Sequence, residues 1–144
     1  MLMIEIAKSE HVESINKIRL SINNDKSSSH NLEDYNYAHI KKSDELVAFV
    51  ATWSKEVIGY LKLEKYWIEG DAIFEVFVCS CFQGKGIGTK LINYAKDYIK
   101  KHMTFNQLRL GVSYNNINAI KLYEKLGFIE IKRDEKGKFM VCKI

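Results

Sequence analysis

Three closely spaced glycines constrain the fold of this chain more than any other feature of its sequence. Gly84, Gly86 and Gly88 follow an apolar run at residues 72–79 and open a segment, residues 87–101, whose apolar side chains recur at a helical period. Glycines let the backbone turn sharply and bring bare N–H groups close to a ligand. A strand–turn–helix unit of this kind predicts an anion site, suited to phosphate oxygens, where the helix begins.

The rest of the chain alternates between apolar runs and amphipathic segments, with no repeat or linker that would divide it. We expect strands at residues 2–7, 46–52, 57–63, 72–79, 108–112, 128–132 and 138–144. We expect helices at residues 10–22, 31–42, 87–101 and 116–126, with a polar loop at 23–31 and Asn31 as a helix cap. The order β-α-α-β-β-β-α-β-α-β-β predicts an α/β fold with a mixed sheet, in one domain spanning residues 1–144.

The composition narrows the class of protein. The sequence contains no stretch of about 18 uncharged apolar residues, so we expect no membrane-spanning helix. The first ten residues lack a basic leader before an apolar core, which argues against a signal peptide. Cys79, Cys81 and Cys142 are odd in number and lack a C-x-x-C spacing, and the histidines are scattered. We therefore expect no disulfide framework and no metal site, and a reducing, cytoplasmic environment.

Charge is distributed unevenly along the chain. Residues 1–70 carry nine Lys and Arg against eleven Asp and Glu, and residues 71–144 carry thirteen against seven. The second half favours an anionic ligand, and the first half is compatible with a cationic one. The basic residues of the second half lack the aromatic interleaving of RNA-binding segments, so we expect no nucleic-acid partner.

Three phosphate-binding patterns compete for the glycine turn. The Walker pattern G-x-x-x-x-G-K-[ST] fails because Thr89 and Leu91 stand where a glycine and a hydroxyl residue are required. The dinucleotide pattern G-x-G-x-x-G fails because Thr89 occupies the third glycine position. The pattern Q/R-x-x-G-x-G fits, as Gln83, Gly86 and Gly88.

With this pattern the sequence resembles the GNAT superfamily of N-acetyltransferases, whose strand–turn–helix segment cradles the pyrophosphate of acetyl-CoA. The resemblance has motif support over about residues 46–132 and implies a mixed, mostly antiparallel sheet flanked by helices. It also implies acetyl-CoA as co-substrate and main-chain contacts to it from Phe77 and Val78, where strands of the family bulge. The turn residues implied to bind acetyl-CoA are Gln83, Gly84, Lys85, Gly86, Ile87, Gly88 and Thr89.

A second segment, residues 116–128, resembles the family's N-x-x-A-x-x-x-Y-E-K-x-G-F helix. Asn116 and Tyr123 are seven residues apart, so on a helix they fall within about 20° of each other, and the small Ala119 lies near the same face. The resemblance makes Tyr123 the general acid that protonates the leaving thiolate, and makes Asn116 and Ala119 neighbours of the cofactor arm. The alternative is that Tyr123 is an ordinary half-buried aromatic residue of an amphipathic helix.

Glu75 is a lone carboxylate within the apolar run AIFEVFVC, so it must face a cavity or be paired. The resemblance implies that it helps to remove a proton from the acceptor ammonium, and the alternative is a salt-bridged structural glutamate. The family's proline near Ser80 is missing here. On the expected helix 31–42, Glu33, Asp34, Tyr35 and Tyr37 either meet a cationic substrate or form a solvated face.

Together these features predict an enzyme that transfers acetyl from acetyl-CoA to a primary amine by direct attack in a ternary complex. The alternative is a non-catalytic acyl-CoA-binding or sensing module on the same fold, which would need neither Glu75 nor Tyr123. Many members of the family are dimers, so the resemblance is also compatible with a homodimer. Fold alone does not choose among amine acceptors.

Overall fold

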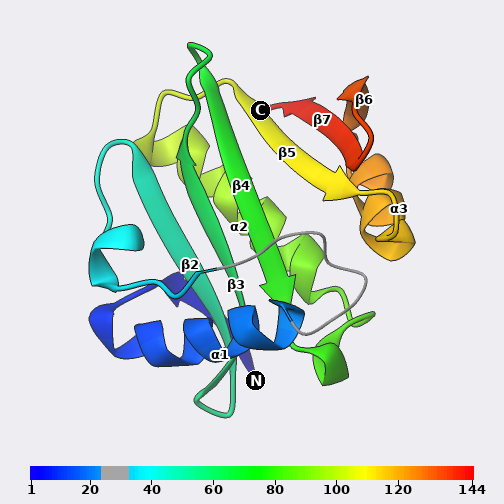
Figure 1. The fold of residues 1–144 in the computed structure, drawn as a ribbon. Helices are drawn as coiled ribbons and strands as arrows, with labels where there is room; N and C mark the ends of the chain where they lie inside the picture. Colours follow the sequence, from blue (N-terminus) through cyan, green and yellow to red (C-terminus); the bar gives the residue numbers. More distant parts are fainter. Residues whose placement is uncertain (24–32) are drawn as a thin grey trace.

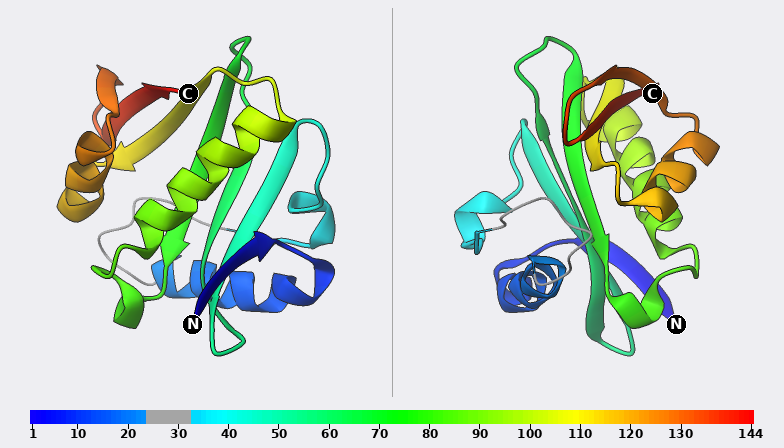
Figure 2. Two further views of the ribbon diagram at one scale, coloured as in Figure 1. Left: turned by 180° about the vertical axis from the view of Figure 1, so that it is seen from behind. Right: turned by 45° about the vertical axis from the view of Figure 1, so that its right-hand side comes forward.

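The computed structural model describes residues 1–23 and 33–144, in which a seven-stranded sheet carries helices on both faces. Helix α1 covers one face, and α2 and α3 cover the other (Figures 1 and 2). The elements in chain order are β1 (Leu2–Ile6), α1 (Val12–Asn23), β2 (Leu46–Trp53), β3 (Glu56–Lys65), β4 (Asp71–Val78), α2 (Ile87–His102), β5 (Gln107–Ser113), α3 (Ile117–Lys125), β6 (Ile129–Arg133) and β7 (Gly137–Lys143). Short 3-10 turns lie at Ser9–His11, Tyr37–His39 and Ser80–Phe82.

The strands lie in the order β1-β2-β3-β4-β5-β7-β6. Every neighbouring pair is antiparallel except β4 and β5, which are parallel. The α/β class and the mixed, mostly antiparallel sheet are therefore confirmed. Each predicted strand, and the helices at 10–22, 87–101 and 116–126, begins and ends within two residues of its expected bounds. None of the helices in the described ranges is long and apolar enough to cross a membrane.

Alternate residues of the central strands feed two apolar clusters, one on each face of the sheet. Phe49, Leu61 and Phe74 pack beneath α2 and α3. Val50 and Tyr60, the cross-strand partners on the other face, pack beneath α1. Because side chains alternate along a strand, successive residues of β4 serve different faces and different clusters.

The expected helix at 31–42 is wrong. Asn31 lies outside the described residues, and from residue 33 the chain is non-helical except for the 3-10 turn Tyr37–His39, which Asn36 caps. The cause is that main-chain groups of Glu33 and Tyr35 bind side chains of α1 instead of one another. The expected loop at 23–31 lies outside the described residues, apart from Asn23, which ends α1.

The parallel pairing of β4 and β5 is short. Over the described residues it joins Asp71, Ala72 and Ile73 to Gln107–Arg109, after which the two strands diverge (Figure 1). Residues 72–79 were expected to form a central, buried strand, and β4 is central. However, burial falls along it, from Ala72 and Phe74, which are buried, to Glu75–Val78, which are partly exposed.

The bulge expected at Phe77 and Val78 is not found in the pairing of β3 with β4. The register runs without a shift from Lys65 opposite Ala72 to Gly59 opposite Val78. Beyond Ile73, β4 has no pairing with β5. A strand that loses its neighbour leaves main-chain hydrogen-bonding groups free on that side.

Candidate functional site

The turn between β4 and α2 presents bare main chain to open space. Gly84 and Gly86 have φ values of +76° and +82°, in the left-handed region that L side chains rarely adopt. A Cβ atom built at either glycine would meet nothing within 4 Å. Gly86 is the N-cap of α2, and the first intrahelical bond runs from the N–H of Lys90 to its carbonyl at 3.1 Å. The N–H groups of residues 87–89 therefore have no intrahelical acceptor and make an anion-binding corner.

The other turn residues have different roles. The Gln83 amide donates a hydrogen bond to the carbonyl of Val78 at 2.9 Å and fastens the turn to the end of β4. Ile87 is buried in the core beneath the turn, so only its main chain faces the open side. Lys85 is exposed with its Nζ 5.4 Å from the centre of the Phe82 ring. Thr89 is partly exposed in the first turn of α2.

Helix α3 lies against the same end of α2. A Cβ atom at Gly88 would lie 3.5 Å from the Leu122 side chain of α3, which is an ordinary contact. Asn116 is the N-cap of α3, and its Oδ1 accepts a hydrogen bond from the Ala119 N–H at 3.3 Å. The structure gives its side-chain oxygen a capping role at the start of the helix.

Tyr123 is 8% exposed and held by two aromatic neighbours. Its ring meets Phe74 of β4 and Phe128 edge-on, with centroid separations of 6.2 and 5.8 Å. Its hydroxyl has no hydrogen-bond partner among the described residues. Burial raises the pKa of Tyr123 to about 12, so the phenol stays protonated at neutral pH and can donate a proton.

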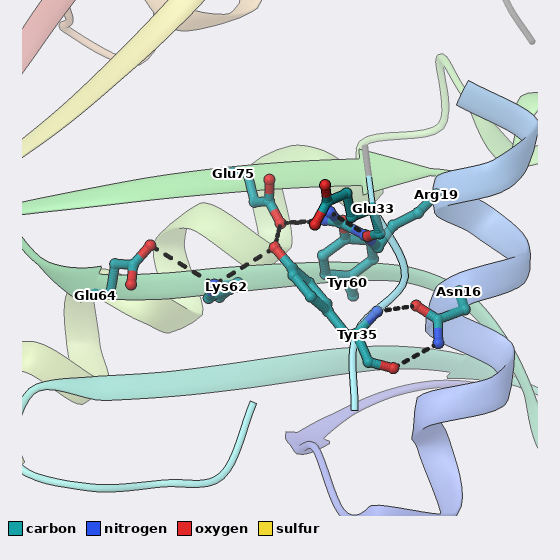
Figure 3. A network of polar contacts seen from close by, with 8 residues as sticks. All are labelled: Asn16, Arg19, Glu33, Tyr35, Tyr60, Lys62, Glu64 and Glu75. Carbon is teal, nitrogen blue, oxygen red and sulfur yellow. Dashed lines mark hydrogen bonds and ion pairs between the residues drawn. The ribbon is translucent and has the colours of Figure 1, made fainter. Parts of the chain in front are cut away.

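Glu75 belongs to a polar cluster under α1 (Figure 3). Its Oε1 accepts hydrogen bonds from Nη1 of Arg19 at 2.6 Å, from the Tyr60 hydroxyl at 3.2 Å and from the Tyr35 hydroxyl. Lys62, its cross-strand neighbour on β3, donates to the Tyr35 hydroxyl at 3.4 Å. The Glu75 side chain is nevertheless 29% exposed, so the glutamate is both salt-bridged and open to solvent.

Glu75 and Tyr123 do not meet, because they lie on opposite faces of the sheet. Phe74 turns toward Tyr123 and the α2–α3 layer, and the next residue of the strand, Glu75, turns toward Arg19 and α1. The strand that carries Glu75 and contacts Tyr123 through Phe74 is unpaired with β5 beyond Ile73.

Sequence reasoning missed Arg19, Tyr60 and Asn16 as parts of this site. A signal for Arg19 existed, since it lies four residues after Ile15 and therefore on the apolar stripe of α1. Among the proposed acceptor-side residues, only Tyr35 reaches the cluster with its side chain, and Glu33 contributes its carbonyl. Asp34 and Tyr37 are exposed.

Comparison with known proteins places these features in a family. The model of the acetyltransferase (GNAT) family matches residues 4–128. The spermidine N(1)-acetyltransferase of Vibrio cholerae is 34% identical over 100 residues, which are 69% of this chain and 58% of that protein. The N-alpha-acetyltransferase of Sulfurisphaera tokodaii is 30% identical over 115 residues, covering 69% of this chain and 68% of that protein. The chain thus spans little more than half the length of the V. cholerae relative.

Solved structures share the whole fold at low sequence identity. A GNAT-family acetyltransferase of Staphylococcus aureus Mu50 superposes with a TM-score of 0.85 at 19% identity, over 99% of both chains. The PaiA N-acetyltransferase of Thermoplasma acidophilum, solved in complex with coenzyme A, gives a TM-score of 0.83 at 20% identity, over 100% of this chain and 99% of that one. The shared fold agrees with the family model, whose match over residues 4–128 shows that the chain belongs to the acetyltransferase (GNAT) family.

Proposed function

We propose that this chain transfers the acetyl group of acetyl-CoA to a primary amine by direct attack within a ternary complex. The observation that carries the proposal is the open corner formed by Gly84, Gly86 and the first turn of α2, which follows the end of β4 that is not paired with β5. This corner has the bare N–H groups and the helix end that a diphosphate requires. The corner follows the half of β4 that is unpaired with β5, where main-chain groups are available to an extended pantetheine arm.

In this proposal the main-chain N–H groups of residues 84–89 hold the diphosphate, with Lys85 and Lys90 supplying positive charge. The open space at Gly84 and Gly86 supports the fit, because a side chain at either position would occupy it. The divergent half of β4 offers main-chain groups of Phe77 and Val78 to the arm and to the acetyl carbonyl. Asn116 and Ala119 flank the arm from α3.

Tyr123 would act as the general acid. A buried phenol whose pKa is raised to about 12 keeps its proton through the working range and can release it to a thiolate formed beside it. The unpartnered hydroxyl supports this role, because no interaction with a described residue must be broken before the proton is transferred.

Glu75 would take the proton from the acceptor ammonium, since an amine must lose that proton before its lone pair can attack the thioester. The three hydrogen bonds that described residues donate to the carboxylate converge on Oε1, and Figure 3 shows the other oxygen pointing away from the cluster. That second oxygen is the one proposed to meet the amine, directly or through water.

Direct attack is favoured over transfer through an enzyme thiol. Burial, together with the neighbouring Cys81, raises the pKa of the Cys79 thiol, so Cys79 is a poor nucleophile at neutral pH. Cys81 is exposed at the 3-10 turn before the glycines.

The test is an acceptor screen with acetyl-CoA that measures both free thiol and the mass of the acetylated product. The panel includes spermidine, free amino acids and peptides with unblocked N-termini, because relatives bear the names of spermidine and N-alpha acetyltransferases. We expect thiol release that depends on one class of amine and yields one amide per thiol. Binding of acetyl-CoA without turnover of any amine would contradict the proposal and favour an acyl-CoA-binding module.

A further inference from the structure

Arg19 is a buried cation that the proposed reaction does not itself use. It extends from α1 across the sheet face to β4 and is 4% exposed. Its Nε and Nη2 both donate to the Glu33 carbonyl, at 3.2 and 3.0 Å. Its Nη1 donates to the Tyr60 hydroxyl at 2.8 Å and to Oε1 of Glu75 at 2.6 Å. These bonds fix the plane of the guanidinium from two directions.

Residues 33–35 also hold the guanidinium group of Arg19 in place. The Tyr35 ring lies over the guanidinium, with Cζ of Arg19 3.5 Å from the ring centre. Asn16, one turn earlier on α1, exchanges two hydrogen bonds with the main chain of Tyr35, at 2.8 and 2.7 Å. Arg19 is therefore held against β4 by α1, β3 and residues 33–35 together (Figure 3).

A second buried arginine–carboxylate pair on the same strand and face has a different form. Asp71 has a side chain 5% exposed and accepts bonds on both oxygens, two from Arg109 at 2.9 and 3.2 Å and two from Gln107 at 3.2 Å. A pair that only joins strands can enclose its carboxylate in this way. Glu75, in contrast, is 29% exposed, and every donor from a described residue reaches Oε1.

We infer that Arg19 is a positioning residue, which fixes the Glu75 carboxylate so that its second oxygen faces the acceptor amine. The inference rests on the proposed function and adds to it the residue that orients the proton acceptor. The fork of the guanidinium is needed because one nitrogen holds Glu75 while the others are anchored to Glu33. Lysine at this position would keep the charge and lose the anchor.

The test is a double-mutant cycle measured in kcat, with the amine identified in the acceptor screen. We expect Arg19→Lys to lower kcat by about 10- to 100-fold, the size expected when a catalytic group is misplaced by about 1 Å. The acetyl-CoA dissociation constant should change by less than about twofold, because the glycine turn does not contact Arg19. In a Glu75→Gln background the same substitution should cost little further kcat, since the group that it positions has been disabled.

Arg109→Lys is the matched control, because it disturbs a buried pair on the same strand and face away from Glu75. It should lower stability and leave the kcat of the folded protein unchanged. Should Arg19→Lys fail to fold, Tyr35→Phe removes one donor to Oε1 while keeping the ring over Arg19. In the Glu75→Gln background, Tyr35→Phe should likewise cost little further kcat.

Equal losses of kcat from Arg19→Lys, or from Tyr35→Phe, in both backgrounds would overturn the positioning role and leave the proposed function standing. A wild-type protein that turns over none of the amines would overturn the proposed function and this role with it. An active wild type with non-additive losses supports both.

Discussion

At its first residue β4 carries Asp71, and four residues later, on the same face, it carries Glu75. Each carboxylate is paired with an arginine, Arg109 from β5 and Arg19 from α1. The first pair lies where β4 and β5 are hydrogen-bonded, and the second lies where they have separated. We call these the closed end and the open end of β4.

The two ends differ in how fully their polar groups are hydrogen-bonded within the protein. At the closed end both oxygens of Asp71 are occupied and the side chains are almost fully enclosed. At the open end the described residues contact only one oxygen of Glu75 and leave the Tyr123 hydroxyl without a partner, and the glycine turn faces open space. Polar groups without a partner in the protein can persist where a ligand supplies the missing hydrogen bonds. We therefore expect the reaction to take place at the open end.

Breaking the closed-end pair should have the largest effect on stability. Arg109→Met leaves Asp71 buried with only Gln107 beside it, and an uncompensated buried charge costs about 3–5 kcal/mol. Denaturant unfolding should show this loss, while kcat per folded molecule stays within about twofold. Adding Asp71→Asn to this variant should recover part of the stability. A loss of kcat with unchanged unfolding would contradict the division of roles between the two ends.

At the open end, Tyr123→Phe should separate catalysis from stability. Removing the general acid should lower kcat by about 100-fold or more, equivalent to about 3 kcal/mol in the barrier. Stability should hardly change, because the ring contacts with Phe74 and Phe128 remain and the hydroxyl has no partner among the described residues. Tyr98→Phe, on α2 against Phe49, is the control and should leave kcat unaltered. Unchanged kcat in Tyr123→Phe would remove Tyr123 from the mechanism.

Alkaline pH should lower the free energy of unfolding through the tyrosines at the open end. Burial raises the pKa of Tyr123 from 10.0 to about 12, and burial with the nearby Glu75 raises the pKa values of Tyr35 and Tyr60. The unfolded chain therefore loses these protons first, and stability is full below pH 10 and falls above it. For Tyr123 alone the loss at pH 11 is about 1.4 kcal/mol. Between pH 9 and pH 11 the free energy of unfolding should fall further in the wild type than in Tyr123→Phe, by about that amount. Equal falls in the two proteins would contradict the assignment.

The smallest effect concerns the charges beside the glycine turn. Lys85→Ala together with Lys90→Ala should weaken acetyl-CoA binding by about 3- to 10-fold, because exposed lysines add modest attraction to main-chain contacts. The loss should shrink as salt is raised. Lys100→Ala with Lys101→Ala, at the other end of α2, is the matched pair and should leave affinity unaltered. Equal weakening by both pairs would indicate a general charge effect.

The elements nearest the open corner could be predicted from sequence because their signals are local. The period of α2, the apolar run of β4 and the glycines between them lie within one stretch of the chain. The pattern singled out Gln83 and Asn116, but it did not indicate that Gln83 bonds to Val78 or that Asn116 caps α3 at Ala119. A sequence pattern specifies a position along the chain, but the hydrogen-bond partner of that residue depends on how the chain packs.

The acceptor side was predicted less well because its contacts join distant segments. Tyr35 is non-helical because Asn16, 19 residues earlier, binds its main chain. Arg19 reaches Glu75 across 56 residues of sequence, so the pairing of that carboxylate could be suspected but its partner could not be named. The register of β3 with β4 has no shift at the positions where strands of the family bulge, and the pairing of β4 with β5 ends at Ile73.

The most direct test follows main-chain amides during titration with coenzyme A and, separately, with acetyl-pantetheine, which lacks the diphosphate. If the corner at the start of α2 holds the diphosphate, the amide resonances of residues 84–89 will shift strongly with coenzyme A and little with acetyl-pantetheine. Those of Asp71 and Arg109 at the closed end will stay in place with both. Resonances that move elsewhere while residues 84–89 remain still would contradict the account.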